Sequence, residues 1–397
     1  MDDDAPNSVY RDPLAHWFVT EAYRIADTGE LVGAAGERLV AAGIPLWRLA
    51  YFQFTLHPEF DGKAYFWRRG RGVGVESAAP GLRQRREYLD NPIAQVQDQR
   101  KALRVRLAEV EPRQPILKQL KSEGATDYVA LPLLFTTGHV DALSVVSDGP
   151  TGFSSADLER MFLLQFAFTR IVETHSLRDT AVNLLDAYVG RAAGQRILAG
   201  EVKRGDGQTI EAVIWYSDLR GFTRASDSLP RNAVIDLLND YFGATGEAVT
   251  AAGGEILKFM GDGMLAMFPV ATAAERAETA ARALWAAAAA TETIAALNVG
   301  RAAVGEPDVR FGLALHIGEV MFGNIGASKR LDFTVIGPAV NYASRLEKLC
   351  ADLGRPLILS AAMAELLPSH TVDAIGRYAL KGIDAPQEVF GLRGISV

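Results

Sequence analysis

Two aspartates stand at the ends of apolar, strand-forming runs, where a carboxylate can meet a metal-bound phosphate. Asp218 lies in the segment VIWYSDLRGFT, and Asp262 lies further on in LKFMGDGMLAMFP. Magnesium prefers carboxylate and phosphate oxygens, so two carboxylates at the ends of adjacent strands predict a seat for two ions. Taken singly, Asp262 also fits a hairpin turn and Asp218 also fits a turn cap. Together the two aspartates indicate nucleotide chemistry.

A short turn beside Asp218 suits a phosphate group. Gly221, Phe222 and Thr223 follow this aspartate in the sequence. A turn relieved by glycine presents its backbone N–H groups to an anion. We therefore predict that these three residues contact the triphosphate of a nucleotide.

A third segment, later in the chain, supplies two further polar side chains. Pro338 suits the first turn of a helix, so Asn341 and Arg345, four residues apart, should project from the same helix face. Arg345 would place a permanent charge against the phosphate that gains charge in the transition state, and Asn341 would orient the ribose. An exposed Asn/Arg pair without a role is the alternative interpretation.

The elements that position these residues follow a regular order. The pattern predicts strands over residues 210–216, 255–260, 264–268 and 309–317, and helices over 230–252 and 272–298. This order is the ferredoxin-like βαββαβ arrangement, an antiparallel sheet with helices on one face. The other face of the sheet is expected to be free.

The strand over residues 255–260 has a side chain of interest on that free face. Successive side chains of a strand alternate between its two faces. Leu257 and Phe259 should therefore point one way, while Ile256, Lys258 and Met260 point the other way. Lys258 is then expected on the open face, where a partner subunit or a ligand must cover it.

Three segments together resemble a class III nucleotidyl cyclase catalytic domain: YSDLRGFT, KFMGDG and FTVIGPAVNYASRL. The resemblance extends from residue 209 to near the C-terminus. It implies two ions, Mg²⁺ or Mn²⁺, held by Asp218, Leu219 and Asp262. In this family the metal aspartates and the other site residues come from opposite subunits, so the resemblance also implies a homodimer.

The same resemblance implies roles for the remaining site residues. Lys258 and Thr334 would select the base, Asn341 would hold the ribose, and Arg345 would stabilise the transition state. The closing stretch RYALKGIDAPQEVFGL also resembles the end of the family, where a lysine contacts the triphosphate. Lys381 is the candidate, and an exposed lysine in a Lys-Gly turn is the alternative.

Lys258 favours adenine over guanine, and Thr334 discriminates less sharply between them. The N1 atom of adenine accepts a hydrogen bond from a lysine, whereas guanine presents an N–H there and would face Lys258 donor against donor. Thr334 stands where many family members have aspartate, and its hydroxyl can donate or accept. Threonine here resembles the subgroup that includes bicarbonate-responsive cyclases, so bicarbonate control is a hypothesis.

The first part of the chain has the pattern of a mixed α/β sensor fold. Strand-like residues 127–135 and 140–147 predict a hairpin, and the following GFSSADLERM resembles the end of a GAF domain, a small-ligand-binding module. Phe153 and Asp157 fit the cyclic-nucleotide-binding type, but residues 147–150 lack its Asn-Lys pair. The ligand of this region is therefore open, and a cyclic nucleotide is not favoured.

A long helix is predicted from Ala156 to about Gly190, capped by Ser154 or Ser155. Nine of its positions alternate three and four apart, and seven of them are apolar. These positions are Met161, Leu164, Phe168, Ile171, His175, Arg178, Val182, Leu185 and Val189. The pattern favours a connector that pairs with another helix, and a core helix packed on the sensor domain is the alternative.

Composition limits the classes of protein. The chain of 397 residues is 49% hydrophobic and 22% charged, which predicts a globular protein of two or three domains. Its net charge of -7 argues against a nucleic-acid partner, and the arginines clustered between residues 68 and 86 are interpreted as a solvated loop. Cys350, the single cysteine, fits a reducing compartment. No apolar run is long enough for a membrane span, and the acidic start MDDDAPN lacks the features of a signal peptide, so we predict a cytoplasmic protein.

We predict three regions: a GAF-like sensor domain over residues 1–155, a signalling helix and linker over 156–208, and a cyclase domain over 209–397. The fold class is α+β. The predicted function is an adenylyl cyclase that converts ATP to cyclic AMP and pyrophosphate as a homodimer, with an unknown small molecule at the sensor. A guanylyl cyclase and a catalytically silent nucleotide-binding sensor are the alternatives. A diguanylate cyclase is disfavoured because the chain lacks a Gly-Gly-Asp/Glu-Glu-Phe motif.

Overall fold

The computed structural model describes residues 12–57, 59–327 and 330–393. The acidic start of the chain and Lys329 lie outside the described residues. The chain divides into two compact units, residues 1–187 and 188–397, and each is described by itself. Among the described helices, none combines the length and the apolar composition that a membrane span needs. Cys350 is buried and unpaired, and burial raises the pKa of its thiol to about 12.

The N-terminal unit is built on a six-stranded antiparallel sheet with the order β3-β2-β1-β6-β5-β4. Its strands are β1 (Leu46–Phe54), β2 (Gly62–Arg68), β3 (Gly72–Ala78), β4 (Leu103–Val105), β5 (Asp127–Leu134) and β6 (Val140–Ser147). The predicted hairpin is confirmed as β5 and β6, whose residues pair from Asp127 with Ser147 to Leu134 with Val140.

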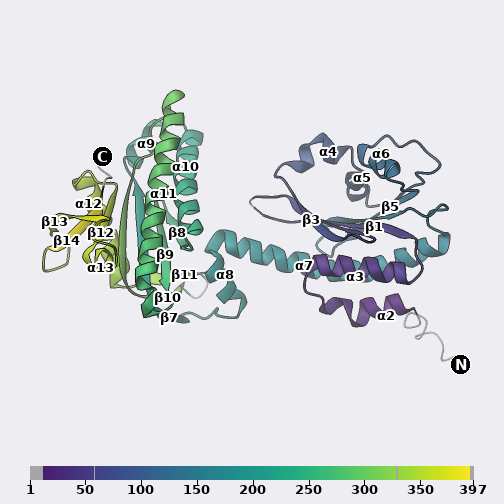
Figure 1. Cartoon of the computed structure of the whole chain (residues 1–397), viewed down its shortest axis with the longest axis horizontal. Helices are drawn as coiled ribbons and strands as arrows, with labels where there is room; N and C mark the ends of the chain where they lie inside the picture. Colours follow the sequence, from purple (N-terminus) through teal and green to yellow (C-terminus); the bar gives the residue numbers. More distant parts are fainter. Residues whose placement is uncertain (1–11, 58, 328–329, 394–397) are drawn as a thin grey trace. The chain divides into compact units, whose positions relative to one another are not determined.

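Helices cover both faces of this sheet (Figure 1). One face packs against α2 (Pro13–Thr20), α3 (Thr28–Ala41) and the start of α7 (Ser155–Val189), through a core that includes Leu31, Trp67 and Phe168. The other face lies under α4 (Arg86–Leu89), α5 (Pro92–Gln99) and α6 (Pro115–Ser122). Short 3-10 turns η1 (Ala22–Arg24) and η2 (Leu82–Gln84) connect these elements.

The predicted long helix is α7, and Ser154 caps it. The Ser154 hydroxyl accepts a hydrogen bond from the Asp157 N–H at 3.1 Å, while the Asp157 carboxylate accepts from the Ser154 N–H at 2.9 Å. The first part of the predicted stripe, with Met161 and Phe168, belongs to the core of the N-terminal unit. His175 is buried as well and lies 3.1 Å from the Thr28 hydroxyl. The core-helix interpretation therefore describes this part of α7, and helix pairing stays a prediction for the rest.

The C-terminal unit has the predicted ferredoxin-like order at its centre. Four strands lie in the order β10-β7-β9-β8, and β14, β13 and β12 extend the sheet beyond β10, while β11 pairs with β10. The strands are β7 (Gly207–Leu219), β8 (Glu255–Met260), β9 (Gly263–Val270), β10 (Phe311–Ala327), β11 (Arg330–Ile336), β12 (Leu357–Ser360), β13 (Val372–Tyr378) and β14 (Gln387–Leu392). The helices are α8 (Arg191–Leu198), α9 (Phe222–Ser228), α10 (Arg231–Ala251), α11 (Arg276–Ala303), α12 (Pro338–Asp352) and α13 (Ala361–Ala364), with the 3-10 turn η3 (Ala273–Glu275).

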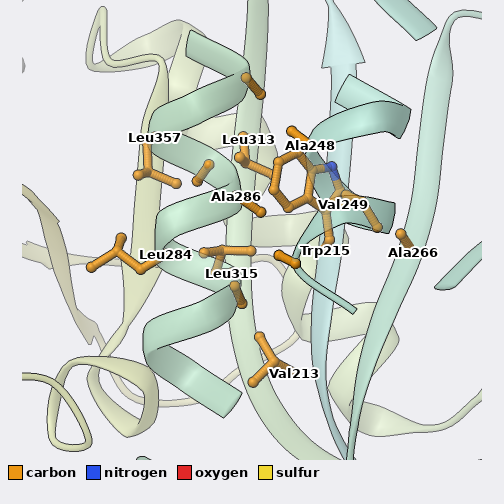
Figure 2. Close-up of a cluster of buried hydrophobic side chains, with 14 of the residues drawn as sticks. Val213, Trp215, Ala248, Val249, Ala266, Leu284, Ala286, Leu313, Leu315 and Leu357 are labelled. Carbon is orange, nitrogen blue, oxygen red and sulfur yellow. The ribbon is translucent and has the colours of Figure 1, made fainter. Parts of the chain in front are cut away.

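Two long helices, α10 and α11, lie side by side along one face of this sheet (Figure 1). Figure 2 shows the core between them and the strands, with the Trp215 ring of β7 beside Val249 of α10 and Leu313 of β10. Fully buried alanines such as Ala286 have small side chains, which let α11 lie close to the strands. This core fixes the strand ends that carry the two aspartates.

The opposite face is not free, in contrast to the prediction. Ala193 of α8 and Ala343 of α12 pack on it, against Ile214 and Leu265 of the central strands. The sequence pattern missed α8 because its packing partners lie far away along the chain. Only part of this face therefore remains for a ligand or a second copy.

The predicted alternation along β8 is also wrong, because the pairing of β8 with β9 shifts between Ile256 and Lys258. The bulge places Leu257 and Met260 in the cluster on the α8 side, while Phe259 contacts the ring of Phe242 on α10. Lys258 pairs with Leu265, which belongs to the α8-side cluster. The expected position of Lys258, opposite α10 and α11, is thus confirmed.

Candidate active site

The two predicted metal aspartates lie next to each other at one edge of the sheet. Asp218 is the penultimate residue of β7 and pairs with Gly263 of β9, which directly follows Asp262 in the β8–β9 turn. The Leu219 N–H donates to the Asp262 carbonyl at 3.2 Å, which joins the two segments. A Cβ atom at Gly263 would lie 3.2 Å from an Asp218 carboxylate oxygen, so a larger residue would crowd this carboxylate.

The electrostatics of this pair favour a cation. Burial raises the pKa of the Asp218 carboxyl above its ordinary value, and the charge of Asp262 raises it further. Two half-buried carboxylates in contact repel each other unless a positive charge lies between them. No third acidic, histidine or cysteine side chain joins them in the described part of the chain. Any further metal contact must come from backbone oxygens such as that of Leu219, or from a bound phosphate.

The predicted phosphate turn leads into a helix. Gly221 has a left-handed backbone with φ 73° and precedes α9, which starts at Phe222. The first N–H groups of a helix have no acceptor within the helix, and Gly221 offers no side chain to cap them. The N–H groups of Phe222 and Thr223 are therefore available to an anion beside Asp218.

A second group of predicted residues surrounds a cavity of about 470 Å³. Asn341, Arg345 and Lys348 line it from α12, and Lys381 lines it from the loop before β14. The loop approaches closely, since a Cβ atom at Gly382 would lie 3.6 Å from the Arg345 guanidinium. The structure thus gathers Asn341, Arg345 and Lys381, which the sequence placed some forty residues apart.

The two predicted base-selecting residues lie on strands that contact each other, β8 and β11. Lys258 is partly exposed. Thr334 pairs with Gly323 of β10 and is 4% exposed, yet its hydroxyl has no hydrogen-bond partner among the described residues. A buried hydroxyl without a partner costs about 1–3 kcal/mol. The Thr334 hydroxyl therefore marks a place where a ligand can supply the missing hydrogen bond.

Sequence reasoning missed an ion pair that joins the two groups. Arg220, directly after Leu219, places its Nη2 atom 2.6 Å from the Glu347 carboxylate, and Nη2 also donates to the Glu347 carbonyl at 3.0 Å. Glu347 is 3% exposed. A Cβ atom at Gly312 would lie 1.8 Å from the Arg220 guanidinium, so any other residue there would displace this side chain. The available signal was a glutamate within the apolar stripe of α12 that includes Leu346 and Cys350.

This ion pair also fixes the orientation of α12. Residues of an α-helix are about 100° apart around the axis, so Arg345 and Glu347 point in nearly opposite directions. Glu347 faces Arg220 and hence the strand end that carries Asp218. Arg345, together with Asn341 one turn before it, consequently faces away from the aspartates of the same chain.

The C-terminal unit matches a known family. Residues 207–394, a little under half of the chain, match the family model described as the adenylate and guanylate cyclase catalytic domain. This range includes every site residue discussed above. Residues 207–394 therefore form a class III adenylyl/guanylyl cyclase catalytic domain. The family description covers both nucleotides, so membership alone does not decide between ATP and GTP.

Two curated relatives carry the name adenylate cyclase. Adenylate cyclase 1 of Rhizobium meliloti (strain 1021) is 34% identical over 175 residues, which cover 42% of this chain and 26% of that protein. Adenylate cyclase of Anabaena cylindrica is 30% identical over 204 residues, which cover 51% of this chain and 39% of that protein. The chain therefore matches well under half of the length of either relative.

Solved structures of cyclases are similar to the same part of the chain. The crystal structure of the adenylyl cyclase CyaB from P. aeruginosa aligns with a TM-score of 0.43 and 27% identity, over 47% of this chain and 95% of that one. The crystal structure of the guanylyl cyclase Cya2 aligns with a TM-score of 0.42 and 30% identity, over 48% of this chain and 95% of that one.

Proposed function

We propose that this protein is an adenylyl cyclase that converts ATP to 3′,5′-cyclic AMP and pyrophosphate as a homodimer. The observation that carries the proposal is the division of the site residues between two faces. Asp218 and Asp262 lie at one strand edge, while Asn341 and Arg345 face away from it because Glu347 binds Arg220. A second copy can place its Asn341 and Arg345 opposite these aspartates, and two such sites then form per dimer.

Two Mg²⁺ or Mn²⁺ ions fit the donors at the strand edge. Asp218 and Asp262 would hold them through carboxylate oxygens, with the Leu219 backbone oxygen as a further ligand, because these hard oxygen donors suit such ions. The raised pKa of Asp218 beside Asp262 supports this assignment, since a cation relieves the repulsion. When bound, the ions lower the pKa of the ribose hydroxyl and neutralise charge on the phosphates.

The residues of the protein would orient one displacement. The ribose 3′-oxygen attacks the α-phosphorus and loses its proton, a new P–O bond forms, and the bond to the β-phosphate oxygen breaks to release pyrophosphate. Arg345 would stabilise the charge that develops on the α-phosphate, and Asn341 would hold the ribose. Lys381, beside Arg345, and the N–H groups around Gly221 would bind the triphosphate.

We also propose that Lys258 and Thr334 select adenine. Lys258 donates to an acceptor such as adenine N1, and the Thr334 hydroxyl gains the hydrogen bond it lacks in the free protein. Purified protein assayed with Mn²⁺ should form cyclic AMP from ATP faster than cyclic GMP from GTP, and Lys258→Glu should shift the preference toward GTP by about tenfold or more. Faster turnover of GTP by the native protein would instead make it a guanylyl cyclase.

Mixing two inactive variants tests the shared site. Asp218→Ala and Arg345→Ala proteins should each be inactive alone, because each homodimer lacks one half of both sites. A mixed dimer has one complete site, so an equal mixture should recover about a quarter of the native activity. Mixing Asp218→Ala with Asp262→Ala provides the control, since both variants damage the same half and should stay inactive. Activity of purified monomers would contradict the proposal.

The N-terminal unit is proposed to be a GAF-like sensor that binds a small molecule and regulates the cyclase through α7. The cytoplasm is the proposed location, in keeping with the free thiol of Cys350. Bicarbonate control through the threonine-bearing site remains a hypothesis, and an unchanged activity after adding bicarbonate at fixed pH would remove it. Binding of ATP by the native protein without any cyclic product would favour the catalytically silent sensor instead.

A further inference from the structure

The N-terminal unit contains a cavity of two lobes between its sheet and helices α5 and α6. The lobes have volumes of about 470 and 410 Å³, and both are lined by Phe52, Phe66, Glu76, Asn91 and Ile93. Small-molecule sites typically have volumes of about 300–1,000 Å³. The shared lining shows that the two lobes adjoin, and each is large enough for a small organic ligand.

The residues on this face of the sheet explain why the space exists. Phe66 of β2 lies between Ala50 of β1 and Gly74 of β3, its partners across the strands. Ala50 in turn pairs with Ser144 of β6. These small residues leave room beside the rings of Phe52 and Phe66, which meet edge to face with 5.9 Å between their centres and form one apolar wall.

Arg48 lines the larger lobe and has no anionic partner. Its guanidinium lies 4.8 Å from the centre of the Phe66 ring. Its cross-strand neighbour Arg68 is paired with Glu123 at 3.0 Å and lies over Trp47 at 4.1 Å. For Arg48, by contrast, no carboxylate within residues 12–57, 59–327 and 330–393 forms an ion pair. Of the arginines that the sequence analysis interpreted as a solvated loop, Arg68 is partly buried, while Arg69, Arg71, Arg83, Arg85 and Arg86 are exposed.

The unpaired charge is unfavourable in the free protein. Burial lowers the pKa of Arg48, and the electrostatic influence of Tyr128, Glu123 and Glu76 opposes this shift without reversing it. Arginine nevertheless stays protonated at any physiological pH, so the charge persists. A partly buried cation beside apolar rings favours a bound anion, and no described carboxylate forms an ion pair with Arg48.

The charges around this lobe indicate which anion fits. Arg68 is already paired with Glu123, and Glu76 is exposed, so Arg48 is the one cation without an ion pair among the described residues that line the larger lobe. A carboxylate carries one negative charge and matches a guanidinium with two parallel hydrogen bonds. A phosphate ester carries about -1.5 to -2 charges and would exceed the available positive charge.

We propose that this cavity binds a monocarboxylate with an aromatic body. Its carboxylate would pair with Arg48, and its ring would pack against the wall that Phe52 and Phe66 form. This proposal gives the proposed sensor a class of ligand. It rests on the proposed function only in that the bound ligand would regulate the cyclase. Binding can be measured without turnover, so failure of the carboxylate site and failure of the cyclase proposal are distinguishable.

Calorimetry on the full chain tests the proposal with defined probes. Benzoate, phenylacetate and indole-3-acetate are titrated, each beside its uncharged amide, together with acetate and inorganic phosphate. At least one aromatic carboxylate should bind with one molecule per chain, and its amide should bind about tenfold or more weakly because it lacks the charge. Tighter binding of inorganic phosphate, equal binding of acid and amide, or no binding by any aromatic carboxylate would overturn the proposal.

Variants locate the site. Arg48→Gln should weaken binding of the carboxylate about tenfold or more, whereas Arg106→Gln, an exposed arginine of the same unit, should leave it unchanged. Arg48→Met should also keep or raise the unfolding temperature of the ligand-free protein, because it removes an unpaired charge. A lower unfolding temperature together with unchanged carboxylate binding would assign Arg48 to packing alone and reject the site.

Discussion

The two units of this chain differ in whether a partly buried arginine forms an ion pair. In the N-terminal unit, Arg48 lines a cavity and has no carboxylate partner among the described residues. In the C-terminal unit, Arg220 is paired with the buried Glu347. The ion pair of Arg220 joins the end of β7 to α12, whereas Arg48 is proposed to bind an anion. A polar side chain without a hydrogen-bond or ion-pair partner is therefore a better indication of a ligand site than a buried polar residue as such.

Other polar groups of the two cores follow the same rule. In the N-terminal unit, the fully buried Asp141 accepts from the Tyr51 hydroxyl at 2.6 Å and from the Phe54 N–H at 2.9 Å. In the C-terminal unit, the Ser217 hydroxyl lies 2.9 Å from the Trp215 indole nitrogen and 2.7 Å from the Tyr241 hydroxyl. These groups are satisfied and structural, in contrast to the Thr334 hydroxyl.

The units also differ in how complete their candidate sites are. Every residue of the N-terminal cavity comes from one unit, so a ligand can bind there without a partner. The candidate cyclase residues of one chain instead face two directions, because α12 turns Arg345 away from Asp218. We infer that ligand binding needs one copy and turnover needs two.

Asp218→Ala should have the largest effect, and it should change the activity of the C-terminal unit without changing ligand binding in the N-terminal unit. Loss of one metal carboxylate should lower cyclase activity by about a thousandfold, as for loss of one essential electrostatic group. Carboxylate binding in the N-terminal unit should stay unchanged. Asp236→Ala, an exposed aspartate of α10, is the control for activity. Retained turnover of Asp218→Ala would reject its metal role, and lost carboxylate binding would reject the independence of the units.

Glu347→Ala should give the next largest effect, on stability. It leaves the Arg220 guanidinium unpaired beside Gly312, at a cost of about 3–5 kcal/mol. Hydrogen exchange read by mass spectrometry should show faster exchange in α12 and β7, and unchanged exchange in the N-terminal unit. Glu292→Ala on the exposed side of α11 is the matched control. Equal effects of both substitutions would mean that the ion pair contributes nothing.

A buried histidine should make the C-terminal unit sensitive to acid. Burial lowers the pKa of His316 to about 4, and its ring lies 2.9 Å from the Ser360 hydroxyl. The unfolded chain takes up a proton at the ordinary value of 6.5, so stability should fall as the pH drops from 6.5 toward 4, by about 3 kcal/mol in total. Urea unfolding across this range measures the loss, and His316→Gln should remove that part of it.

The same test extends the comparison to the other unit. Burial, followed by the charge of Arg178, lowers the pKa of His175 in α7. The sign is the same, so acid should destabilise the N-terminal unit through His175 below the ordinary pKa of histidine. An unchanged pH dependence in His175→Gln would contradict this expectation.

Tyr51→Phe should have the smallest effect of the series, in the N-terminal unit alone. The substitution removes one hydrogen bond to the Asp141 carboxylate, which keeps the Phe54 N–H and the His139 ring at 2.8 Å as partners. Loss of a hydrogen bond to a charged group costs about 2 kcal/mol. Urea unfolding should show this loss, and Tyr23→Phe, at an exposed tyrosine, should not.

Much of the C-terminal unit was predictable from local patterns. The strand predicted over residues 255–260 has the bounds Glu255–Met260 in the structure, and the βαββαβ order is confirmed. Alternation failed within this strand because one extra residue, Leu257, has no partner on β9 and shifts the register of the residues that follow. The face predicted to be free carries α8, because a helix pattern does not reveal which strands it will meet.

The chemistry proposed for this protein could be predicted from sequence, because the aspartates, Lys258, Asn341 and Arg345 stand in short motifs whose residue types can be read locally. Their division between two sides of the C-terminal unit depends on tertiary contacts. The pairing of Arg220 with Glu347, 127 residues apart, turns Arg345 away from the aspartates. The same holds for Arg48, whose lack of a partner follows from which side chains β2, β5 and α6 bring around it. Such contacts depend on sheet register and packing between distant segments, and no local stretch of sequence contains them.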